Sequence, residues 1–321
     1  MLNYLALLGA AAIWGFAFVA QRKGMQSLDP FIFNALRFAL GALCIMLAQF
    51  AGRWFTGKAE PMPQAARPAG LSKNYRREPL VLGLLLFFAA SLQQVGMLWT
   101  GAGNAGFITG LYVVIVPILG LWRGQRMRRG AIIAVLLAVA GLWFINSTQR
   151  VNASVGNLLV LGGSVFWALH VQMIDKLTSR HASLDLARVQ YLVCAGCSLA
   201  VGVFYRRLFI PGGYDFGGLG SAIQAAALPL LYAGIFSVGI AFTLQIQAQK
   251  KVAPQAASVI LCSEAVFALI GGYLLLGEEL NAASLLGAAL LLAAMLSSVL
   301  SRRDKIFLVD KKASRRNWYP N

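Results

Sequence analysis

Apolar residues recur along the chain in long runs that short polar stretches separate. Each run is close to the ~20 residues that an α-helix needs to cross the hydrocarbon core of a bilayer. The pattern therefore predicts ten transmembrane helices, which fill most of the chain and leave no soluble domain. Their ranges are 3–22, 30–50, 79–99, 103–122, 130–147, 155–177, 184–205, 224–249, 254–277 and 281–301.

Composition supports a membrane protein. Hydrophobic residues make up 59% of the 321 residues and charged residues 12%, whereas soluble domains have about 45–50% and about 25%. The first run lacks a basic leading segment and a small-residue cleavage site, so we expect it to remain as a span. The cysteines all lie within predicted spans and are best explained as packing residues rather than disulfides. They are Cys44, Cys194, Cys197 and Cys262.

Most of the 28 lysines and arginines lie in every second connection and after the last span. Positive residues gather on the cytoplasmic side of membrane proteins, so both termini are expected to be cytoplasmic. The net charge of +17 then reflects topology and attraction to anionic lipid headgroups, not nucleic-acid binding. Residues 51–78 and 302–321 are too polar to span. They are expected to form a flexible basic loop and a basic cytoplasmic tail, with lipid contact as an alternative role.

Four stretches of the first half align, in order, with four stretches of the second. The paired ranges are 13–23 with 166–176, 27–29 with 183–185, 82–94 with 233–245, and 105–119 with 253–267. The spacing is nearly constant at about 150 residues, which indicates an internal repeat. Residues 1–150 and 151–301 would each contain five spans. Because five is odd, the second repeat must enter the membrane from the opposite side, which predicts an all-α fold of two inverted five-helix repeats.

Two motifs carry a resemblance to a known family. They are AAIWGFAFVAQRKGMQSLDPFIFNALRF near the start and APQAASVILCSEAVFALIGGYLLLGEELN near the end. With them, residues 1–301 resemble the EamA-type transporters of the drug/metabolite transporter superfamily. The resemblance implies a multi-pass protein of the bacterial inner membrane that exports or exchanges small metabolites such as amino acids through a central cavity.

The chain departs from the family pattern at two places. The family usually has Glu-Pro-Val where this chain has Glu264, Ala265 and Val266, and the basic stretch RGQRMRRG replaces a Leu-Gly-Glu element in the first half. In the family a proline accompanies a helix break at this point, and this chain lacks that proline. Pro117 is expected to keep the break in the first half.

Glu264 is the strongest candidate for function. It lies about 10 residues from Pro254 and about 13 from Gly277, which places it near the bilayer centre, where an acid costs about 2.5–3.5 kcal/mol. It is therefore expected to face the bundle interior. It could be protonated and hydrogen-bonded, bind a cation or cationic substrate, or shuttle a proton.

Other polar and aromatic residues within the spans are weaker candidates. His170 could relay protons with Glu264 or simply pack. Trp14 and Trp167 occupy equivalent positions in the two repeats and could line a cavity or pack. Gln94 and Gln245 form a second equivalent pair, suited to cavity contacts or to hydrogen bonds between helices. Tyr112 and Ser258 lie on paired spans. Arg37 is expected to extend towards the outer surface, with an anionic substrate group as the alternative.

No enzyme, nucleotide or metal motif fits the chain. GAGNAG at 101–106 follows no strand, so it fails the context of a dinucleotide site. There is no P-loop and no metal-binding cluster, so no cofactor or metal is expected. The sequence predicts a secondary transporter that works by alternating access, with proton coupling among the roles left open for Glu264. The alternative is a non-transporting membrane scaffold or a lipid-binding receptor.

Overall fold

The computed structural model describes residues 2–56, 73–125, 127, 129–146, 154–209, 216–276 and 280–300. All regular structure in these ranges is helical. The elements are α1 (Leu2–Gly24), α2 (Pro30–Thr56), α3 (Lys73–Gly96), α4 (Ala102–Gly110), α5 (Tyr112–Trp122), α6 (Arg129–Asn146), α7 (Val155–Leu177), α8 (Ser183–Phe209), α9 (Phe216–Ala225), α10 (Ala227–Leu231), the π-helix η2 (Tyr232–Phe242), α11 (Thr243–Gln249), α12 (Pro254–Leu261), α13 (Glu264–Leu276) and α14 (Ala282–Leu300).

Nine helical segments of the described residues are long and apolar enough to cross a membrane. Three of them combine consecutive elements: α4 with α5, α10 with η2 and α11, and α12 with α13. The predicted span at 130–147 corresponds to α6, whose apolar stretch is shorter. The short helix α9 had no counterpart among the predicted spans.

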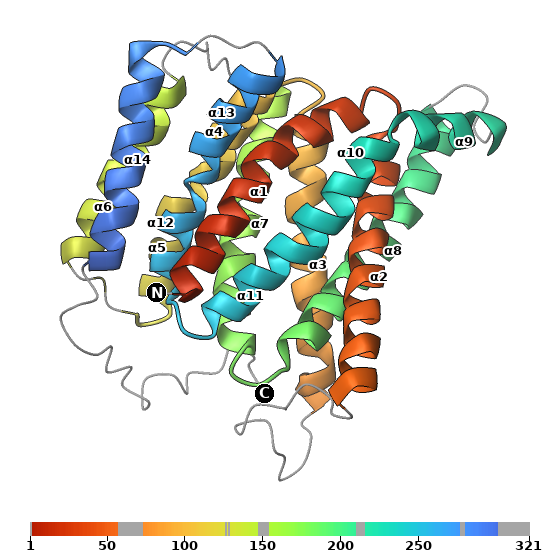
Figure 1. The fold of residues 1–321 in the computed structure, drawn as a ribbon, viewed down its shortest axis with the longest axis horizontal. Coiled ribbons are helices and arrows are strands. Elements are labelled where there is room, and N and C mark those ends of the chain that lie inside the picture. The colour runs from red at the N-terminus through yellow and green to blue at the C-terminus, as the bar shows by residue number, and fades with distance from the viewer. Residues whose placement is uncertain are drawn as a thin grey trace.

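The helices form an elongated bundle (Figure 1). On one side α6 packs along α14, and on the other α2 packs along α8. Between these pairs, α1 and α7 lie near the centre with α12, α13, α4 and α5 on one flank and α3 on the other. We call the end where α1 begins and α14 ends the lower end, as it is drawn in Figure 1, and the opposite end the upper end.

Side chains are distributed as expected for a protein in lipid. Large apolar side chains point outward, such as Leu47 at 58% and Trp143 at 66% exposure. Polar side chains lie inside, and Gln94, Gln190 and Ser198 are fully buried. This is consistent with a hydrocarbon solvent, because polar groups that face acyl chains cannot be solvated.

Contact between α6 and α14 depends on two glycines. A Cβ placed on Gly287 would lie 2.5 Å from the Gly141 carbonyl oxygen and 2.5 Å from the Ile145 nitrogen. A Cβ on Gly141 would lie 2.8 Å from the Gly287 carbonyl oxygen. Small residues at such positions allow the backbones of membrane helices to approach closely.

The loop expected at 51–78 is helical at both of its ends. α2 continues to Thr56, and α3 begins at Lys73. The extension of α3 is held in place by contacts of Glu78 with the turn between α7 and α8. Residues 57–72 and the expected basic tail at 302–321 lie outside the described residues.

Two membrane helices are interrupted near their middles. α4 gives way to α5 at Leu111, where the amide of Leu111 bonds the Ile108 carbonyl. α12 gives way to α13 at Cys262 and Ser263, directly before Glu264. The two interruptions adjoin, since the Cys262 thiol lies 3.8 Å from the Gly110 carbonyl oxygen. Pro117 is not the cause of the first break, because it lies inside the continuous helix α5.

The second break forms without proline. The Ser263 hydroxyl donates to the Ile260 carbonyl at 2.6 Å, and the Ser263 amide bonds the same carbonyl. Serine side chains compete in this way with the regular bonds of a helix. The loss of the family's proline at position 265 therefore does not remove the break.

Candidate functional site

A central cavity lies where the interrupted helices meet α1, α2, α3, α7 and η2. The cavity volume is about 50 Å³, and since a single water needs roughly 10–15 Å³, the cavity has room for a small solute. Its walls combine aromatic rings, amides, a guanidinium and a carboxyl group. The lining residues are Trp14, Phe18, Gln21, Arg37, Gln93, Thr109, Tyr112, Trp167, Val171, Ser237, Phe242, Gln245, Leu261 and Glu264.

Two tryptophans and a phenylalanine form an aromatic wall. The Phe242 ring lies 4.6 Å from Trp14 and is stacked on Trp167 at 5.7 Å between centroids. Both indoles are fixed by hydrogen bonds: Trp14 Nε1 donates to the Ser237 carbonyl at 3.1 Å, and Trp167 Nε1 donates to Gln93 Oε1 at 2.8 Å. The wall is therefore rigid and can receive the apolar part of a ligand.

Glu264 lies in this cavity at the first position of α13, directly after the break. Only 5% of it is exposed, and its Oε1 has no hydrogen-bond partner among the described residues. Gln21 Oε1 and Gln245 Oε1 in the same lining are also buried without a partner. Buried polar atoms are normally hydrogen-bonded, so a cluster of unpartnered atoms around one cavity is typical of a binding site.

Five of the predicted site residues line the cavity, namely Trp14, Trp167, Tyr112, Gln245 and Glu264. Three others lie outside the lining. His170 is fully buried and its Nε2 lies 2.8 Å from Gln190 Oε1 on α8. Ser258 donates within its own helix to the Gln255 carbonyl at 2.9 Å. Gln94 is fully buried away from the cavity.

The sequence did not single out Gln93 or Phe242, and it favoured an outward position for Arg37 over contact with an anionic substrate group. Gln93 precedes the predicted Gln94 by one residue, which is about 100° of rotation around a helix. It accepts from Trp167 and lies 3.4 Å from the Thr109 hydroxyl. Arg37 does not reach the outer surface, since it is only 4% exposed and lines the cavity.

Below the cavity, hydrogen bonds tie the helices together towards the lower end. Gln172 Nε2 on α7 donates to the Val116 carbonyl on α5 at 2.8 Å, and Gln249 Nε2 on α11 donates to the Val171 carbonyl at 3.0 Å. Arg123 Nη1 donates to Gln172 Oε1 at 2.7 Å. Arg123 is placed by the turn at Gly124, whose φ of 76° favours glycine.

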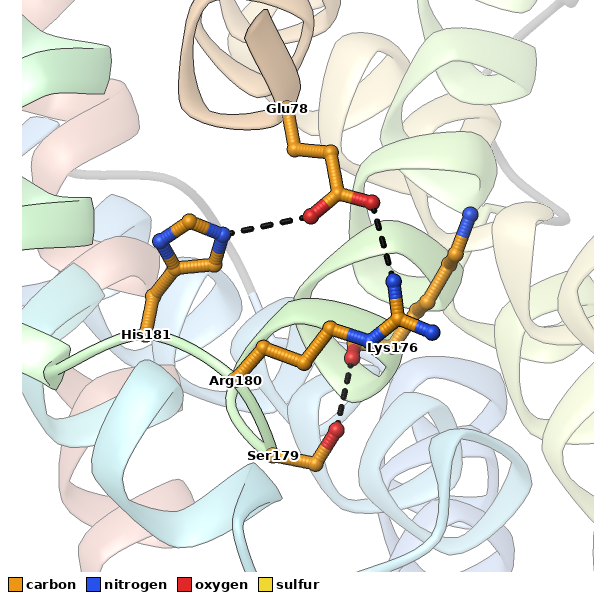
Figure 2. Close-up of polar contacts among 5 residues, drawn as sticks. All are labelled: Glu78, Lys176, Ser179, Arg180 and His181. Atoms are coloured by element: carbon orange, nitrogen blue, oxygen red, sulfur yellow. Dashed lines mark hydrogen bonds and ion pairs between the residues drawn. The ribbon is translucent and has the colours of Figure 1, made fainter. Parts of the chain in front are cut away.

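Glu78 makes a second tie at the lower end (Figure 2). Its carboxylate accepts from Arg180 Nη1 at 3.2 Å and contacts His181 Nε2 at 3.2 Å. The Tyr75 ring stacks on His181 at 4.1 Å between centroids. Burial, together with the carboxylates of Asp185 and Glu78, raises the pKa of the Tyr75 phenol, so the phenol stays neutral in this cluster. The start of α3 is thereby fixed to the turn between α7 and α8.

Among the described residues there is no group of three His, Cys, Asp or Glu side chains that could hold a metal ion. The cavity offers aromatic surface, amides, a guanidinium and a carboxylate. These groups suit reversible binding of a small polar solute.

Comparison with known proteins agrees with the architecture. The chain is 27% identical to an uncharacterized transporter of Archaeoglobus fulgidus, covering 91% of this chain and 84% of that protein. It is 26% identical to the threonine/homoserine exporter RhtA of Salmonella typhimurium, covering 89% and 90%. A crystal structure at 17% identity shares the fold, with a TM-score of 0.72 and coverage of 94% of this chain and 97% of that chain.

The model of the EamA-like transporter family matches residues 1–147 and again residues 154–300. These matches cover nearly the whole chain, and nine segments of the described residues could span a bilayer. The chain is therefore a multi-pass integral protein of the bacterial inner membrane and belongs to the EamA-like transporter family.

Proposed function

We propose that the protein is a secondary transporter that exports or exchanges small amino-acid-like metabolites by alternating access to the central cavity. The observation that carries the proposal is the small cavity between the two halves, lined by aromatic and polar side chains, with Glu264 buried and incompletely bonded in its wall. The RhtA relatives, named as threonine/homoserine exporters, support an amino-acid-like substrate. Glu264 is the candidate for proton coupling.

The proposed architecture is ten spans in two inverted repeats, 1–150 and 151–301, with α6 as the tenth span. The double match of the family model supports the repeat. Helix contacts support the repeat too, because the main contacts between the two halves have counterparts made by the equivalent helices. α3 packs on α7 as η2 and α11 pack on α1, and α3 packs on α8 as η2 packs on α2. α13 packs on α1 as α4 and α5 pack on α7.

We further propose that the lower end is cytoplasmic, since most of the lysines and arginines lie in the connections at that end and after the last span. The cavity lining reaches Gln21, Arg37 and Gln93 in the upper half, whereas hydrogen bonds close the lower half. The conformation then corresponds to a state that is shut towards the cytoplasm. Transport requires these lower ties to break and the upper half to close.

Counterflow in proteoliposomes tests the proposal. Vesicles that contain the purified protein and unlabelled L-threonine should accumulate labelled L-threonine or L-homoserine, and protein-free vesicles should not. An imposed pH gradient should change the rate if protons are coupled. Folded protein that moves no amino acid with or without the gradient would contradict the proposal. That result would favour the alternative of a membrane scaffold or lipid-binding receptor.

Glu78→Gln is expected to loosen the lower end. The substitution keeps the size of the side chain but removes the charge that holds Arg180 and His181. Hydrogen bonds to charged groups contribute about 1.5–3 kcal/mol, and half of the Arg180 side chain is exposed, so we expect the lower part of this range. Hydrogen–deuterium exchange of the Arg180 and His181 amides, which bond the Leu177 carbonyl, should accelerate by about ten- to thirtyfold.

Arg188→Gln is the matched control. Arg188 pairs with Asp185 at 3.2 Å on the first turns of α8, and the two side chains are 38% and 51% exposed. Exposed pairs contribute little to stability, so the same amides should exchange at the wild-type rate. Equal exchange in Glu78→Gln and the wild type would show that Glu78 does not hold the lower end shut.

A further inference from the structure

Arg37 is a buried cation in the cavity wall that has no acidic partner. It is 4% exposed, and its Nε has no hydrogen-bond partner among the described residues. Arg180 and Arg188 form ion pairs with Glu78 and Asp185, but none of the ion pairs in the described part of the chain includes Arg37. The charge therefore remains uncompensated inside the bundle.

The surroundings of Arg37 hold its guanidinium without neutralising it. The guanidinium carbon lies 4.9 Å from the centroid of the Phe38 ring and 5.9 Å from that of Phe33. Cation–π contacts offset part of the loss of hydration, but arginine stays protonated in proteins. Asp29, the acid at the start of α2, already accepts from the amides of Phe31 and Ile32 as a helix cap. The arrangement fits an arginine that is kept for an anionic ligand group.

Glu264 supplies a carboxyl group in the same cavity. It comes from α13, whereas Arg37 comes from α2, and the two do not form an ion pair. Arg37 lies seven residues inside the upper end of α2, about 10 Å along the helix axis, and Glu264 lies about 15 Å from the lower end of α12. In a core of about 30 Å, Arg37 then lies about a third of the way in from the upper end and Glu264 near mid-depth. A guanidinium and a carboxyl group that line one small cavity without pairing suit the carboxylate and the ammonium group of a zwitterion.

We propose that the cavity selects a small zwitterion, with Arg37 as the residue that binds its carboxylate and Glu264 as the residue that receives its ammonium group. The planar guanidinium suits a carboxylate because it can donate two parallel hydrogen bonds. The aromatic wall of Trp14, Trp167 and Phe242 contacts the apolar part of the solute. Arg37 thus determines specificity for the acid group. This inference rests on the proposed function for its role in transport, but not for binding.

Three probes separate the two charges: L-threonine, its methyl ester, which lacks the carboxylate, and N-acetyl-L-threonine, which lacks the ammonium. Binding to the purified full chain is measured by calorimetry or by thermal stabilisation. The wild type should bind L-threonine at least tenfold more tightly than either derivative. Methyl ester binding as tight as L-threonine binding, or no preference for the zwitterion, would overturn the inference.

Variants assign each charge to its residue. Arg37→Gln should weaken L-threonine and N-acetyl-L-threonine at least tenfold and leave the methyl ester within twofold. Glu264→Gln should weaken binding of L-threonine and of the methyl ester, and it should leave binding of N-acetyl-L-threonine nearly unchanged. Arg37→Lys keeps the positive charge but lacks the planar guanidinium, so it should recover part of the affinity for L-threonine. It replaces Arg37→Gln as the test variant if Arg37→Gln does not fold. Arg188→Gln is the matched arginine control and should bind all three probes as the wild type does.

The outcomes distinguish this inference from the proposed function. Selective binding without counterflow would sink the transport proposal and keep the zwitterion site. Counterflow of L-threonine with equal binding of L-threonine and its methyl ester would keep the transport proposal and overturn the zwitterion site. Arg37→Gln protein that binds all three probes as the wild type does would remove Arg37 from recognition.

Discussion

Glu264→Gln is expected to lower kcat/KM for amino-acid counterflow at least tenfold while leaving the yield of folded protein unchanged. Tenfold corresponds to about 1.4 kcal/mol. Glutamine has the same size and can still form hydrogen bonds, but it carries neither a charge nor an exchangeable acid proton. Because Oε1 of Glu264 has no hydrogen-bond partner among the described residues, loss of the carboxylate should affect transport and not folding.

The pH dependence of transport is the sharper measurement. Wild-type counterflow is expected to vary with pH, and the profile of Glu264→Gln is expected to be flat. Glu264→Asp is the matched control, because it keeps the carboxylate and should keep a pH-dependent profile at a reduced rate. Wild-type kinetics in Glu264→Gln across the pH range would remove this carboxylate from the mechanism.

Gly287→Ala should lower the thermal stability of the protein. The added methyl group would lie 2.5 Å from two backbone atoms of α6, the Gly141 oxygen and the Ile145 nitrogen. Backbone atoms cannot rotate away as a side chain can, so α6 and α14 must separate. Overpacking of this kind costs about 1–3 kcal/mol. The melting temperature of the detergent-solubilised protein should fall by several degrees.

Gly196→Ala tests whether that effect comes from the close contact. Gly196 is also within a helix, α8, but a Cβ placed there meets no atom within 4 Å. Alanine is favoured over glycine in a helix by about 0.5–1 kcal/mol, so this variant should be as stable as the wild type or slightly more so. If both variants melt at the wild-type temperature, the glycine contact is not important for the pairing of α6 with α14.

The positions of the membrane helices could be predicted from the sequence because they depend on local hydrophobicity. α7 spans Val155–Leu177, as expected for 155–177, and α1 exceeds its predicted range by one residue at one end and two at the other. The break before Glu264 could not be predicted from the rule that proline interrupts helices. It depends on the Ser263 hydroxyl and on contact with Gly110, and the second of these requires the tertiary fold.

The site was harder to predict than the helices because it depends on helix rotation. Repeat alignment selected Gln94 as the partner of Gln245, but on α3 it is Gln93 that faces the cavity. His170 looked like a cavity residue because it is ionisable and lies mid-span, and yet its ring contacts Gln190 on α8. Arg37 was expected near the surface because long basic side chains usually extend there. Only the packing around Phe33 and Phe38 shows that it points inward.

The tie at Glu78 has no equivalent in the second half. In the alignment of 82–94 with 233–245, the position that corresponds to Glu78 is Pro229, which has no carboxylate. In the proposed alternating-access cycle the Glu78 contact stabilises only the state that is shut at the lower end, so we expect the unliganded protein to populate that state more than the other. Apparent affinity scales with the populated fraction of the competent state, so a solute that arrives from the closed side meets a weaker site. Unequal populations change the speed and the concentration dependence of transport in each direction, but the final gradient depends only on the solutes and ions that move.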